Sequence, residues 1–490
     1  MSKSLRTHFL KEFPKALNDG TAAVFVGAGV SMAAGYPSWA TLLKEIGEEL
    51  GVNSNDVQDL TALAQWSIRE TGSASRVRDV ILKEIKPQKP IPPSVEILAR
   101  LPVRHIWTTN YDLLIERAFD EIHRPYQSIA SGPALARRVP MRGATRLYKM
   151  HGCVNSIDEI VISTDDYELY RSRRGQFLPL FQAHLTGMSM LFIGISFTDP
   201  NIKHVLSLIR ESFIDAPPEH FAIVRPPQRS DFTNKKTYEA RLTQHRLWAK
   251  DLQRYGLKAV EVERYDEIPE LLKEIERRLA AKRIWVSGSW PLNVQSDEAP
   301  RIYQFAEKLG KRIADTDRDL VTGAGVLVGS ASLQGFVSAL RKGAEWDIDR
   351  RLTARPFPQP LEGQQPDREE WTALRTELAK HAGAVVFVGG MKVEDGKEKP
   401  EIAKGVLEEF EIAKKSGAYL LPIAATGGAA VIIHDLLKGS SMPFKGANAQ
   451  RPSDKELKAL FNPDLLKTDQ GQTELLNMVF TILDRLHVVS

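Results

Sequence analysis

The sequence predicts an α/β protein built of two tandem Rossmann-like domains with mostly parallel sheets. Three observations support this fold class. Short apolar runs alternate with amphipathic stretches along the whole chain, which is the pattern of strands buried between helices. Each half of the chain has a glycine-rich turn after its first apolar run. The length of 490 residues also exceeds that of a typical single domain.

Candidate strands follow from the apolar runs. In the first half they cover residues 22–26, 103–108, 146–150, 190–193, 221–224 and 258–262, and in the second half 283–287, 319–322, 384–388 and 419–423. The charged segment 268–282 is predicted to be a helix that joins the halves. We therefore expect one domain over residues 1–282 and a second domain over residues 283–490.

Two further helical regions are expected. Residues 53–86 should form an insertion beside the first sheet. One face of this insertion is predicted to carry Leu60, Leu63, Ala64 and Trp66. The final apolar helix, residues 474–486, should pack on the second domain or on another subunit.

The composition excludes several classes of protein. With 66 Lys and Arg against 62 Asp and Glu, the formal net charge is only +4, which does not indicate binding to nucleic acid or to a membrane surface. No segment approaches the ~18 apolar residues of a membrane span, and the N-terminus lacks the apolar run of a signal peptide. We therefore expect a soluble, cytoplasmic protein with no nucleic-acid or membrane partner.

Cysteine usage narrows the chemistry further. The chain has one cysteine, Cys153, so it can form neither an intrachain disulfide nor a zinc site of several cysteines. No clustered histidines replace them, and we expect no bound metal. Cys153 lies two residues after His151, but we expect a buried structural residue rather than a thiol nucleophile.

A glycine-rich loop follows the first apolar run. It contains Gly27 and Gly29, and the next glycine is Gly35. Glycines let a backbone approach a phosphate closely, and the helix that follows offers its N-terminal dipole to an anion. The spacing differs from the dinucleotide fingerprint of dehydrogenases, so a ligand loop and a plain tight turn are both open on spacing alone.

Three later segments strengthen the case for a ligand site. Thr-Thr-Asn-Tyr-Asp at 108–112 and Lys-Met-His-Gly at 149–152 each follow an apolar run, and residues 192–201 repeat the pattern of a strand and then a glycine. Asn110 and His151 are therefore expected at the carboxyl ends of strands, where open α/β sheets bind their ligands.

Together these segments resemble the sirtuin family, whose signature is a Gly-Ala-Gly-x-Ser loop, a Thr-x-Asn-x-Asp segment and a His-Gly pair. The resemblance covers about residues 10–280, and the order of the motifs agrees. It implies NAD+ as the substrate and Asn110 and His151 as the catalytic residues. The residues that it implies for NAD+ binding are Gly27, Ala28, Gly29, Ser31, Asp112, Gly194 and Ser196.

The sequence departs from the deacylating sirtuins at two points. Those enzymes resemble one another in having a zinc ribbon of four cysteines, which a chain with one cysteine cannot form. Their first loop continues through Gly-Ile-Pro-x-Phe-Arg, whereas residues 35–40 read Gly-Tyr-Pro-Ser-Trp-Ala and lack the arginine. Acyl-lysine chemistry is therefore disfavoured, whereas cleavage of the bond between nicotinamide and ribose is not.

Cleavage of that bond depends on positioning and electrostatic stabilisation, because the leaving nicotinamide is already cationic and the ribose passes through an oxocarbenium-like state. The amide oxygen of Asn110 would face the developing positive charge. His151, mostly neutral at cytosolic pH, would accept a proton from water or from a ribose hydroxyl. Asp112 is expected to anchor the loop or the start of the next helix rather than to react.

The second half repeats the pattern of a strand followed by a glycine turn. One apolar run leads into Gly288 and Ser289, and another leads into Gly323 and Gly325. Arginines that converge on such turns suit a pyrophosphate or nucleotide ligand, because a guanidinium group pairs with two phosphate oxygens.

This half resembles the SLOG family, which includes nucleotide-sensing members, over about residues 280–490. The Gly-Gly-x-Gly-Thr-x-x-Glu loop of the enzymatic relatives is broken at residues 389–396, which favours ligand binding over phosphoribohydrolase chemistry. The residues expected to bind the ligand are Gly288, Ser289, Gly323, Gly325, Arg355, Arg375, Lys392 and Glu409.

A sirtuin-like domain fused to a SLOG-like domain is similar to the effector NADases of the bacterial Thoeris anti-phage system. That resemblance implies an NAD+ glycohydrolase that is activated by a cyclic ADP-ribose isomer, which a companion TIR-domain enzyme makes. It also implies a homotetramer or filament that depletes cellular NAD+. Two alternatives are a sirtuin-type protein deacylase or ADP-ribosyltransferase, and a non-enzymatic nucleotide-binding scaffold.

Overall fold

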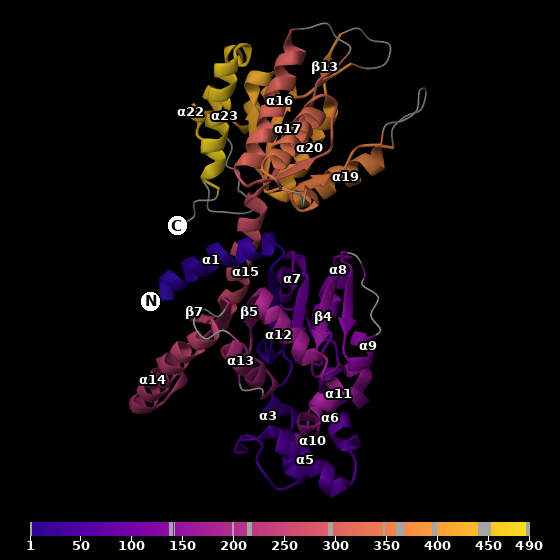
Figure 1. The fold of residues 1–490 in the computed structure, drawn as a ribbon, viewed down its shortest axis with the longest axis vertical. Coiled ribbons are helices and arrows are strands. Elements are labelled where there is room, and N and C mark those ends of the chain that lie inside the picture. Colours follow the sequence, from indigo (N-terminus) through magenta and orange to yellow (C-terminus); the bar gives the residue numbers. More distant parts are fainter. Residues whose placement is uncertain are drawn as a thin grey trace. The chain divides into compact units, whose positions relative to one another are not determined.

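The chain forms two compact units, Met1–Ile275 and Glu276–Ser490, in the computed structural model (Figure 1). The described residues are 2–136, 141, 143–197, 200–212, 218–292, 297–345, 348–358, 367–393, 399–439 and 452–486. The division between the units falls inside helix α15 (Ile268–Ala281), the segment expected to join the domains. The predicted domain boundary after residue 282 lies just beyond this helix and stays a prediction.

The first unit contains a seven-stranded sheet with the order β3-β4-β2-β1-β5-β6-β7, in which every neighbouring pair is parallel. Its strands are Ala22–Val26 (β1), His105–Thr108 (β2), Tyr126–Ile129 (β3), Thr145–Lys149 (β4), Ser189–Ile193 (β5), His220–Val224 (β6) and Leu257–Glu261 (β7). From the central β1 the chain runs to β2, β3 and β4 on one side, and from β4 it crosses to β5, β6 and β7 on the other side. This reversal of direction is a topological switch point, so ligands are expected beyond the carboxyl ends of these strands.

All six strands predicted for this half are present, with ends within two residues of the predicted ones. Edge strand β3 is missed by sequence reasoning. Of its residues only Ile129 is buried, because the strand lies at the margin of the sheet, and it therefore lacks the continuous apolar run of a central strand.

Helices cover both faces of this sheet. Those of the first unit besides α15 are Ser2–Asn18 (α1), Ala28–Ala33 (α2), Trp39–Leu42 (α3), Lys44–Glu49 (α4), Leu60–Thr71 (α5), Ser75–Ile85 (α6), Pro93–Arg100 (α7), Leu114–Glu121 (α8), Gly132–Ala136 (α9), Thr164–Glu168 (α10), Tyr170–Arg174 (α11), Phe177–Gly187 (α12), Pro200–Ser212 (α13) and Lys235–Leu252 (α14). On one face, Phe177 and Phe181 of α12 share a core with Phe25 and Phe192 of the sheet. On the other face, Phe9 of α1 packs against Phe221 of β6.

The predicted helical insertion at residues 53–86 contains two helices, α5 and α6. Both pack near the carboxyl end of β4, where α5 contacts α10 and α6 contacts the 3-10 helix η1 (Val154–Glu159). Gln65 of α5 exchanges two hydrogen bonds of 3.0 Å with Asp165. The prediction that Trp66 shares one face with Leu63 and Ala64 is wrong. Trp66 is 49% exposed, whereas Leu63 and Ala64 are fully buried.

The second unit contains a five-stranded parallel sheet with the order β10-β9-β8-β11-β14. Its strands are Arg283–Ser289 (β8), Asp319–Thr322 (β9), Leu352–Ala354 (β10), Ala384–Gly389 (β11) and Tyr419–Ile423 (β14). The four predicted strands are present, and short edge strand β10 is missed because none of its residues is fully buried. A small antiparallel ribbon, Met391–Lys392 (β12) with Glu401–Ile402 (β13), is also missed.

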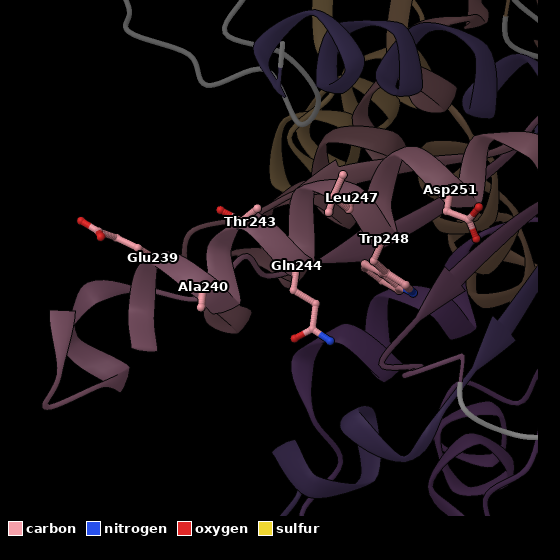
Figure 2. Close-up of a pocket in the computed structure, with 7 residues that line it drawn as sticks. All are labelled: Glu239, Ala240, Thr243, Gln244, Leu247, Trp248 and Asp251. Atoms are coloured by element: carbon pink, nitrogen blue, oxygen red, sulfur yellow. The ribbon is translucent and has the colours of Figure 1, made fainter. Parts of the chain in front are cut away.

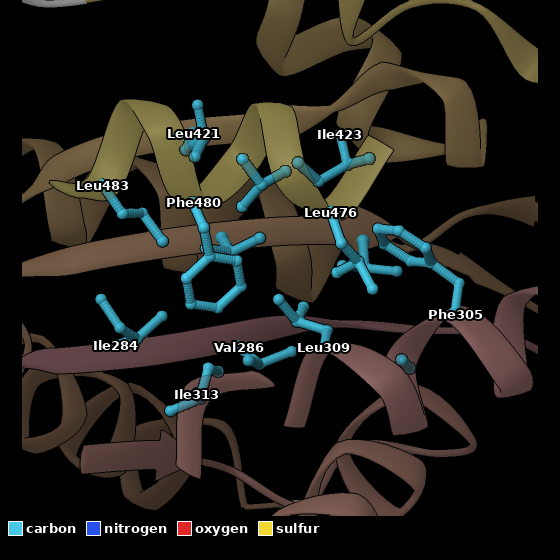
Figure 3. Close-up of a cluster of buried hydrophobic side chains, with 14 of the residues drawn as sticks. Ile284, Val286, Phe305, Leu309, Ile313, Leu421, Ile423, Leu476, Phe480 and Leu483 are labelled. Carbon is cyan, nitrogen blue, oxygen red and sulfur yellow. The ribbon is translucent and has the colours of Figure 1, made fainter. Parts of the chain in front are cut away.

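Alternate residues of these strands enter two different cores. The helices of this unit are Glu298–Asp315 (α16), Val328–Lys342 (α17), Ile348–Arg351 (α18), Arg368–His381 (α19), Lys404–Ser416 (α20), Ala429–Leu437 (α21), Asp454–Ala459 (α22) and Asp469–Asp484 (α23). Figure 3 shows one core, where Ile284 and Val286 of β8 meet Leu309 of α16 and Phe480 of α23. The intervening Trp285 faces the other core with α19, α20 and α21.

The final helix, expected on the second domain or on another subunit, is α23, and it packs inside the second unit. No helix among the described residues is both long and apolar enough to cross a membrane.

Candidate functional site

Asn110 links the loop after β2 to the loop after β1. Its side-chain amide nitrogen donates hydrogen bonds to the carbonyl oxygen of Gly27 at 3.0 Å and to Ser31 Oγ at 2.8 Å. Its backbone nitrogen donates to Oγ1 of Thr108, the last residue of β2, at 2.9 Å. Because a carbonyl oxygen can only accept, the bond to Gly27 identifies the amide nitrogen and thereby orients the amide oxygen. The protein itself therefore sets the orientation of this side chain.

Asp112 completes the network around Asn110. Ser31 Oγ donates to Asp112 Oδ2 at 2.5 Å, and the backbone nitrogen of Leu114, the first residue of α8, donates to Asp112 Oδ1 at 3.0 Å. Ser31 and Asp112 are both buried. Since both carboxylate oxygens accept hydrogen bonds from the protein, Asp112 anchors the start of α8 in this structure.

The loops after β1 and β5 pack directly against each other, and this close packing depends on Gly27, Gly29 and Gly194. The backbone nitrogens of Gly27 and Gly29 donate to the carbonyl oxygens of Ile193 and Gly194. A Cβ atom on Gly27 would lie 2.5 Å from the carbonyl oxygen of Gly194, and one on Gly194, where φ is +70°, would lie 2.7 Å from the nitrogen of Val30. Loop packing alone requires these glycines, so a role in phosphate binding stays a prediction.

Three of the residues predicted to bind NAD+ are exposed at these strand ends. Ala28 and Gly29 begin α2, directly after β1, and Ser196 lies in the loop after β5. Ala28, Gly29 and Ser196 therefore lie at the surface at this edge of the sheet. Residues 198–199, within the predicted segment 192–201, lie outside the described residues.

His151 follows β4 as Asn110 follows β2. The two strands are neighbours whose last residues pair with each other, and Asn110 and His151 each lie two residues beyond that pair. Two tyrosine rings meet the imidazole ring edge to face, Tyr167 at 5.4 Å and Tyr170 at 6.2 Å between ring centroids. Only 2% of His151 is exposed. The imidazole ring is thus enclosed by the protein at the carboxyl edge of the sheet.

Lys149 and Glu116 form a buried ion pair that sequence reasoning misses. Lys149 Nζ lies 2.9 Å from Glu116 Oε1 and also donates to the backbone carbonyl oxygen of Asp112. Burial opposes the charged ammonium group, but the negative charges nearby, led by Glu116, outweigh it and raise the pKa of Lys149. The only signal in the sequence is the lysine of the Lys-Met-His-Gly segment at 149–152, and nothing there pairs it with Glu116.

Four of the residues predicted for the second ligand site lie at the carboxyl edge of the second sheet. Gly288 and Ser289 end β8, whereas Gly323 and Gly325 follow β9. A Cβ atom on Gly288 would lie 2.0 Å from a carbonyl oxygen of β11, and one on Gly323 would lie 2.4 Å from the ring of Phe357. The glycines therefore allow the strand ends and the ring of Phe357 to pack closely together. Phe357 is not among the residues predicted from the sequence.

Arg355 and Lys392 are partly exposed cations near the same edge. Arg355 follows β10, and its Nε donates to Glu377 Oε1 at 2.8 Å. Lys392 belongs to β12, and its Nζ lies 3.5 Å from Glu401 Oε1. The side chains of Arg355 and Lys392 are 43% and 39% exposed. Exposed ion pairs contribute little to stability, so these cations can exchange their partners for an anionic ligand at small cost.

Arg375, in contrast, lies in the interior. It is 5% exposed, and its Nη1 donates to Glu408 Oε2 at 2.9 Å. Its guanidinium group lies 5.0 Å from the ring centroid of Phe357 and 5.5 Å from that of Trp371. Arg375 is thus a buried cation held by a carboxylate and two aromatic rings.

Glu409 is a buried carboxyl group between Arg375 and β8. Ser287 Oγ donates to Glu409 Oε2, and Nε of Arg375 lies 3.5 Å from Glu409 Oε1. Burial raises the pKa of Glu409, and the bond from Ser287 and the charge of Arg375 only partly oppose this effect. Arg375 and Glu409 therefore contact each other in the core, whereas Arg355 and Lys392 are reachable from solvent.

A surface depression of about 870 Å³ lies along α14 (Figure 2). It is lined by Glu239, Ala240, Thr243, Gln244, Leu247, Trp248 and Asp251. These residues all come from one helix, and none of them is a predicted site residue. The two carboxylates, Glu239 and Asp251, lie on separate turns and do not converge. We therefore assign the candidate site to the carboxyl edges of the sheets and not to this depression.

Cys153 is buried, as the sequence predicts for a structural cysteine. Within the part of the chain that the structure describes, no three His, Cys, Asp or Glu side chains are grouped in a way that could hold a metal ion.

Two families match successive parts of the chain. Residues 104–249 match the SIR2-like domain, and residues 267–486 match the Sir2- and TIR-associating SLOG family. The first match includes the segments that carry Asn110 and His151, and the second includes every residue predicted for the second ligand site. The two resemblances expected from the motifs are thereby confirmed.

Three relatives are similar over most of their length, and all are named NAD(+) hydrolase ThsA. The protein of Bacillus cereus (strain MSX-D12) is 34% identical over 86% of this chain and 87% of its own. That of Enterococcus faecium is 33% identical over 88% and 90%, and that of Acinetobacter baumannii (strain 532279) is 32% identical over 84% and 86%. With the SIR2-like and SLOG domains in the same chain, this protein belongs to the ThsA family.

Proposed function

We propose that this protein hydrolyses NAD+ to nicotinamide and ADP-ribose at the carboxyl edge of the first sheet. The observation that carries the proposal is the oriented Asn110, bonded to Gly27 and Ser31 two residues beyond β2, in a chain whose relatives are named NAD(+) hydrolases. An amide that the protein already orients loses no further freedom when charge develops on the substrate, which is how electrostatic preorganisation lowers a barrier.

The proposed roles follow from the chemistry of the leaving group. Nicotinamide departs as a neutral molecule and leaves positive charge on the ribose, which the amide oxygen of Asn110 would stabilise. His151 would accept the proton of the attacking water or of a ribose hydroxyl group. The substrate would be held by Gly27, Ala28, Gly29, Ser31, Asp112, Gly194 and Ser196.

Because His151 is enclosed in this structure, we propose that the structure represents a resting form and that substrate reaches the imidazole only after a covering segment moves. The nearest covering side chains are Tyr167 and Tyr170, which precede and begin α11. A rearrangement of this segment would couple an activating signal to catalysis.

We further propose that a cyclic ADP-ribose isomer binds the carboxyl edge of the second sheet and activates the enzyme. Arg355 and Lys392 would supply the first phosphate contacts, because their present partners are exposed carboxylates. For Arg375 to bind phosphate as well, the phosphate would have to compete with Glu408. The remaining predicted contacts are Gly288, Ser289, Gly323, Gly325 and Glu409.

The match to a TIR-associating family supports a companion TIR-domain enzyme as the source of this ligand. We extend the proposal to NAD+ depletion in anti-phage defence and to a homotetramer or filament, both on the resemblance to Thoeris effectors.

The deciding experiment incubates the purified chain with NAD+, with and without cyclic ADP-ribose isomers, and follows the release of nicotinamide. Release that increases with one isomer supports the proposal. Release only with an acylated peptide would favour the deacylase, and no release under any condition would favour the scaffold. Asn234→Ala is a matched control for Asn110→Ala, because Asn234 only caps the exposed helix α14.

A further inference from the structure

The buried Lys149 is the last residue of β4, and its side chain reaches across to the neighbouring loop and helix. Its ammonium group donates to the backbone carbonyl oxygen of Asp112 and to Glu116 Oε1. The side chains of Lys149 and Glu116 are 1% and 8% exposed. Ser128 of β3 adds a hydrogen bond of 3.2 Å to the same carboxylate oxygen. One side chain thus joins β4 to the loop after β2, to α8 and, through Glu116, to β3.

The contact to Asp112 connects Lys149 with the predicted catalytic residues. The loop from Asn110 to Asp112 follows β2, and the side chains of both residues meet at Ser31. His151 follows Lys149 by two residues on the other strand. The Lys149 ammonium group is therefore a direct bridge between the backbone that carries Asn110 and the backbone that carries His151.

Stability alone does not explain a buried ion pair at this point. Removing two charges from water costs several kcal/mol for each ion, and apolar residues of similar size are often as stable or more stable. An ammonium group offers three hydrogen-bond donors, so it can bond a backbone carbonyl oxygen and a carboxylate at once, which an apolar side chain cannot do. The geometry of Lys149 therefore suggests a positional role.

We propose that Lys149, supported by Glu116, is a positioning residue that holds the Asn110 loop in register with His151 for cleavage of NAD+. It acts through the carbonyl oxygen of Asp112 and does not touch the substrate. The inference rests on the proposed NAD+ hydrolysis and adds to it two residues that no sequence motif assigns.

The test replaces both charges at once. In the double variant Lys149→Met with Glu116→Leu, neither member of the ion pair is left buried without the other, so we expect the melting temperature of the full chain to fall less than in either single variant. We expect kcat for nicotinamide release to fall ~30-fold or more, while KM for NAD+ changes less than ~3-fold, because substrate contacts remain but the catalytic loops lose their register.

Arg124→Met serves as the matched control. Arg124 is also a partly buried cation that donates to backbone carbonyl oxygens, those of Ala99, Leu101 and Val103, but it lies at the amino end of β2. This variant should lower the melting temperature and leave kcat within ~3-fold of the wild type. A double variant with normal kcat, or a control with an equal loss of kcat, would overturn the positioning role.

If the double variant does not fold, two single substitutions by glutamine test the proposal. Glu116→Gln keeps an acceptor for Lys149, and kcat should stay within ~5-fold of the wild type. Lys149→Gln removes the ammonium group, and kcat should fall ~10-fold or more. Equal kcat values in the two variants would overturn the inference. A wild-type chain that releases no nicotinamide would instead refute the proposed function, so the two failures are distinguishable.

Discussion

The two sheets differ in how their predicted site residues are held: those of the first sheet form one largely buried network, whereas those of the second include a buried pair, Arg375 and Glu409, and two partly exposed cations. In the first unit, Asn110, Ser31 and Asp112 are joined by hydrogen bonds of 2.5–2.8 Å within a largely buried network. In the second unit, Arg355 and Lys392 are partly exposed and are paired with partly exposed carboxylates. Both edges lie at the same place in the same type of fold, so the architecture alone does not account for the difference.

This contrast fits a division of labour between catalysis and sensing. A catalytic site lowers the barrier more when its groups are fixed before the substrate arrives, because no free energy is then needed to orient them during the reaction. A sensing site gains from groups that can exchange partners, because a ligand shifts a conformational equilibrium only through contacts that differ between the two states. Four predictions test whether the two edges differ in this way.

The largest effect is expected from Asn110 and His151, the two residues proposed to be catalytic. Asn110→Ala or His151→Ala should lower kcat for nicotinamide release ~100-fold or more, because each change removes a positioned electrostatic or proton-accepting group. The melting temperature should change little for Asn110→Ala, since that side chain is only partly buried. Near-normal release by either variant, measured at saturating NAD+, would remove that residue from the mechanism.

A smaller effect is expected from Ser31→Ala, which removes the hydroxyl group between Asn110 and Asp112. Loss of one buried hydrogen-bond partner typically costs about 1–2 kcal/mol, so we expect kcat to fall ~10-fold. Ser332→Ala is the control, since Ser332 is equally buried in a helix of the other unit and donates to Gly329 within that helix. Equal kcat for both variants would mean that the network is not needed for catalysis.

At the second edge, buried and exposed arginines should respond differently. Arg375→Ala should lower the melting temperature, because Glu408 and the buried Glu409 lose a cation, and it should raise the activator concentration for half-maximal release ~10-fold or more. Arg355→Ala should raise that concentration only ~3–10-fold and leave the melting temperature unchanged. Calorimetric titration with cyclic ADP-ribose isomers provides the parallel binding measurement. Identical melting and activation curves for the two variants would contradict the expected difference between the buried Arg375 and the partly exposed Arg355.

The smallest effect on activity is expected from His220, at the amino end of β6. Its Nδ1 accepts a hydrogen bond of 3.2 Å from the Met190 nitrogen, and burial lowers its pKa to about 4 from the ordinary 6.5. The folded state thus resists protonation that the unfolded state accepts. Stability should be full above pH 6.5 and should fall by about 3 kcal/mol as the pH drops to about 4.

His220→Gln keeps an acceptor for Met190 but does not titrate, so this part of the pH dependence should disappear from urea titrations of the full chain. His204→Gln, at a less buried histidine, should retain it. Equal pH dependence in His220→Gln and the wild type would show that His220 does not control acid stability. Nicotinamide release at pH 7.5 should be the same in all three proteins.

The sequence by itself determined the strand positions, the glycine turns and the placement of Asn110 and His151 at strand ends. These features depend on local patterns, since an apolar run buries a strand and the residues that follow it must emerge at the edge of the sheet. Edge strands β3 and β10 were not predicted, because a strand with one open side does not need a continuous apolar run.

Only the tertiary structure decided which side chains meet. Lys149 contacts Glu116 because β4 lies between β2 and β3. This order of strands cannot be predicted from the spacing of motifs along the chain. The sequence predicts Arg375 as a ligand-binding residue, but only the packing of α19 on α20 shows that it is enclosed beside Glu409. Strand order, register and helix packing bring together residues that are far apart in the chain. The free energy of these contacts depends on how two segments fit each other, which the local pattern of either segment does not reveal.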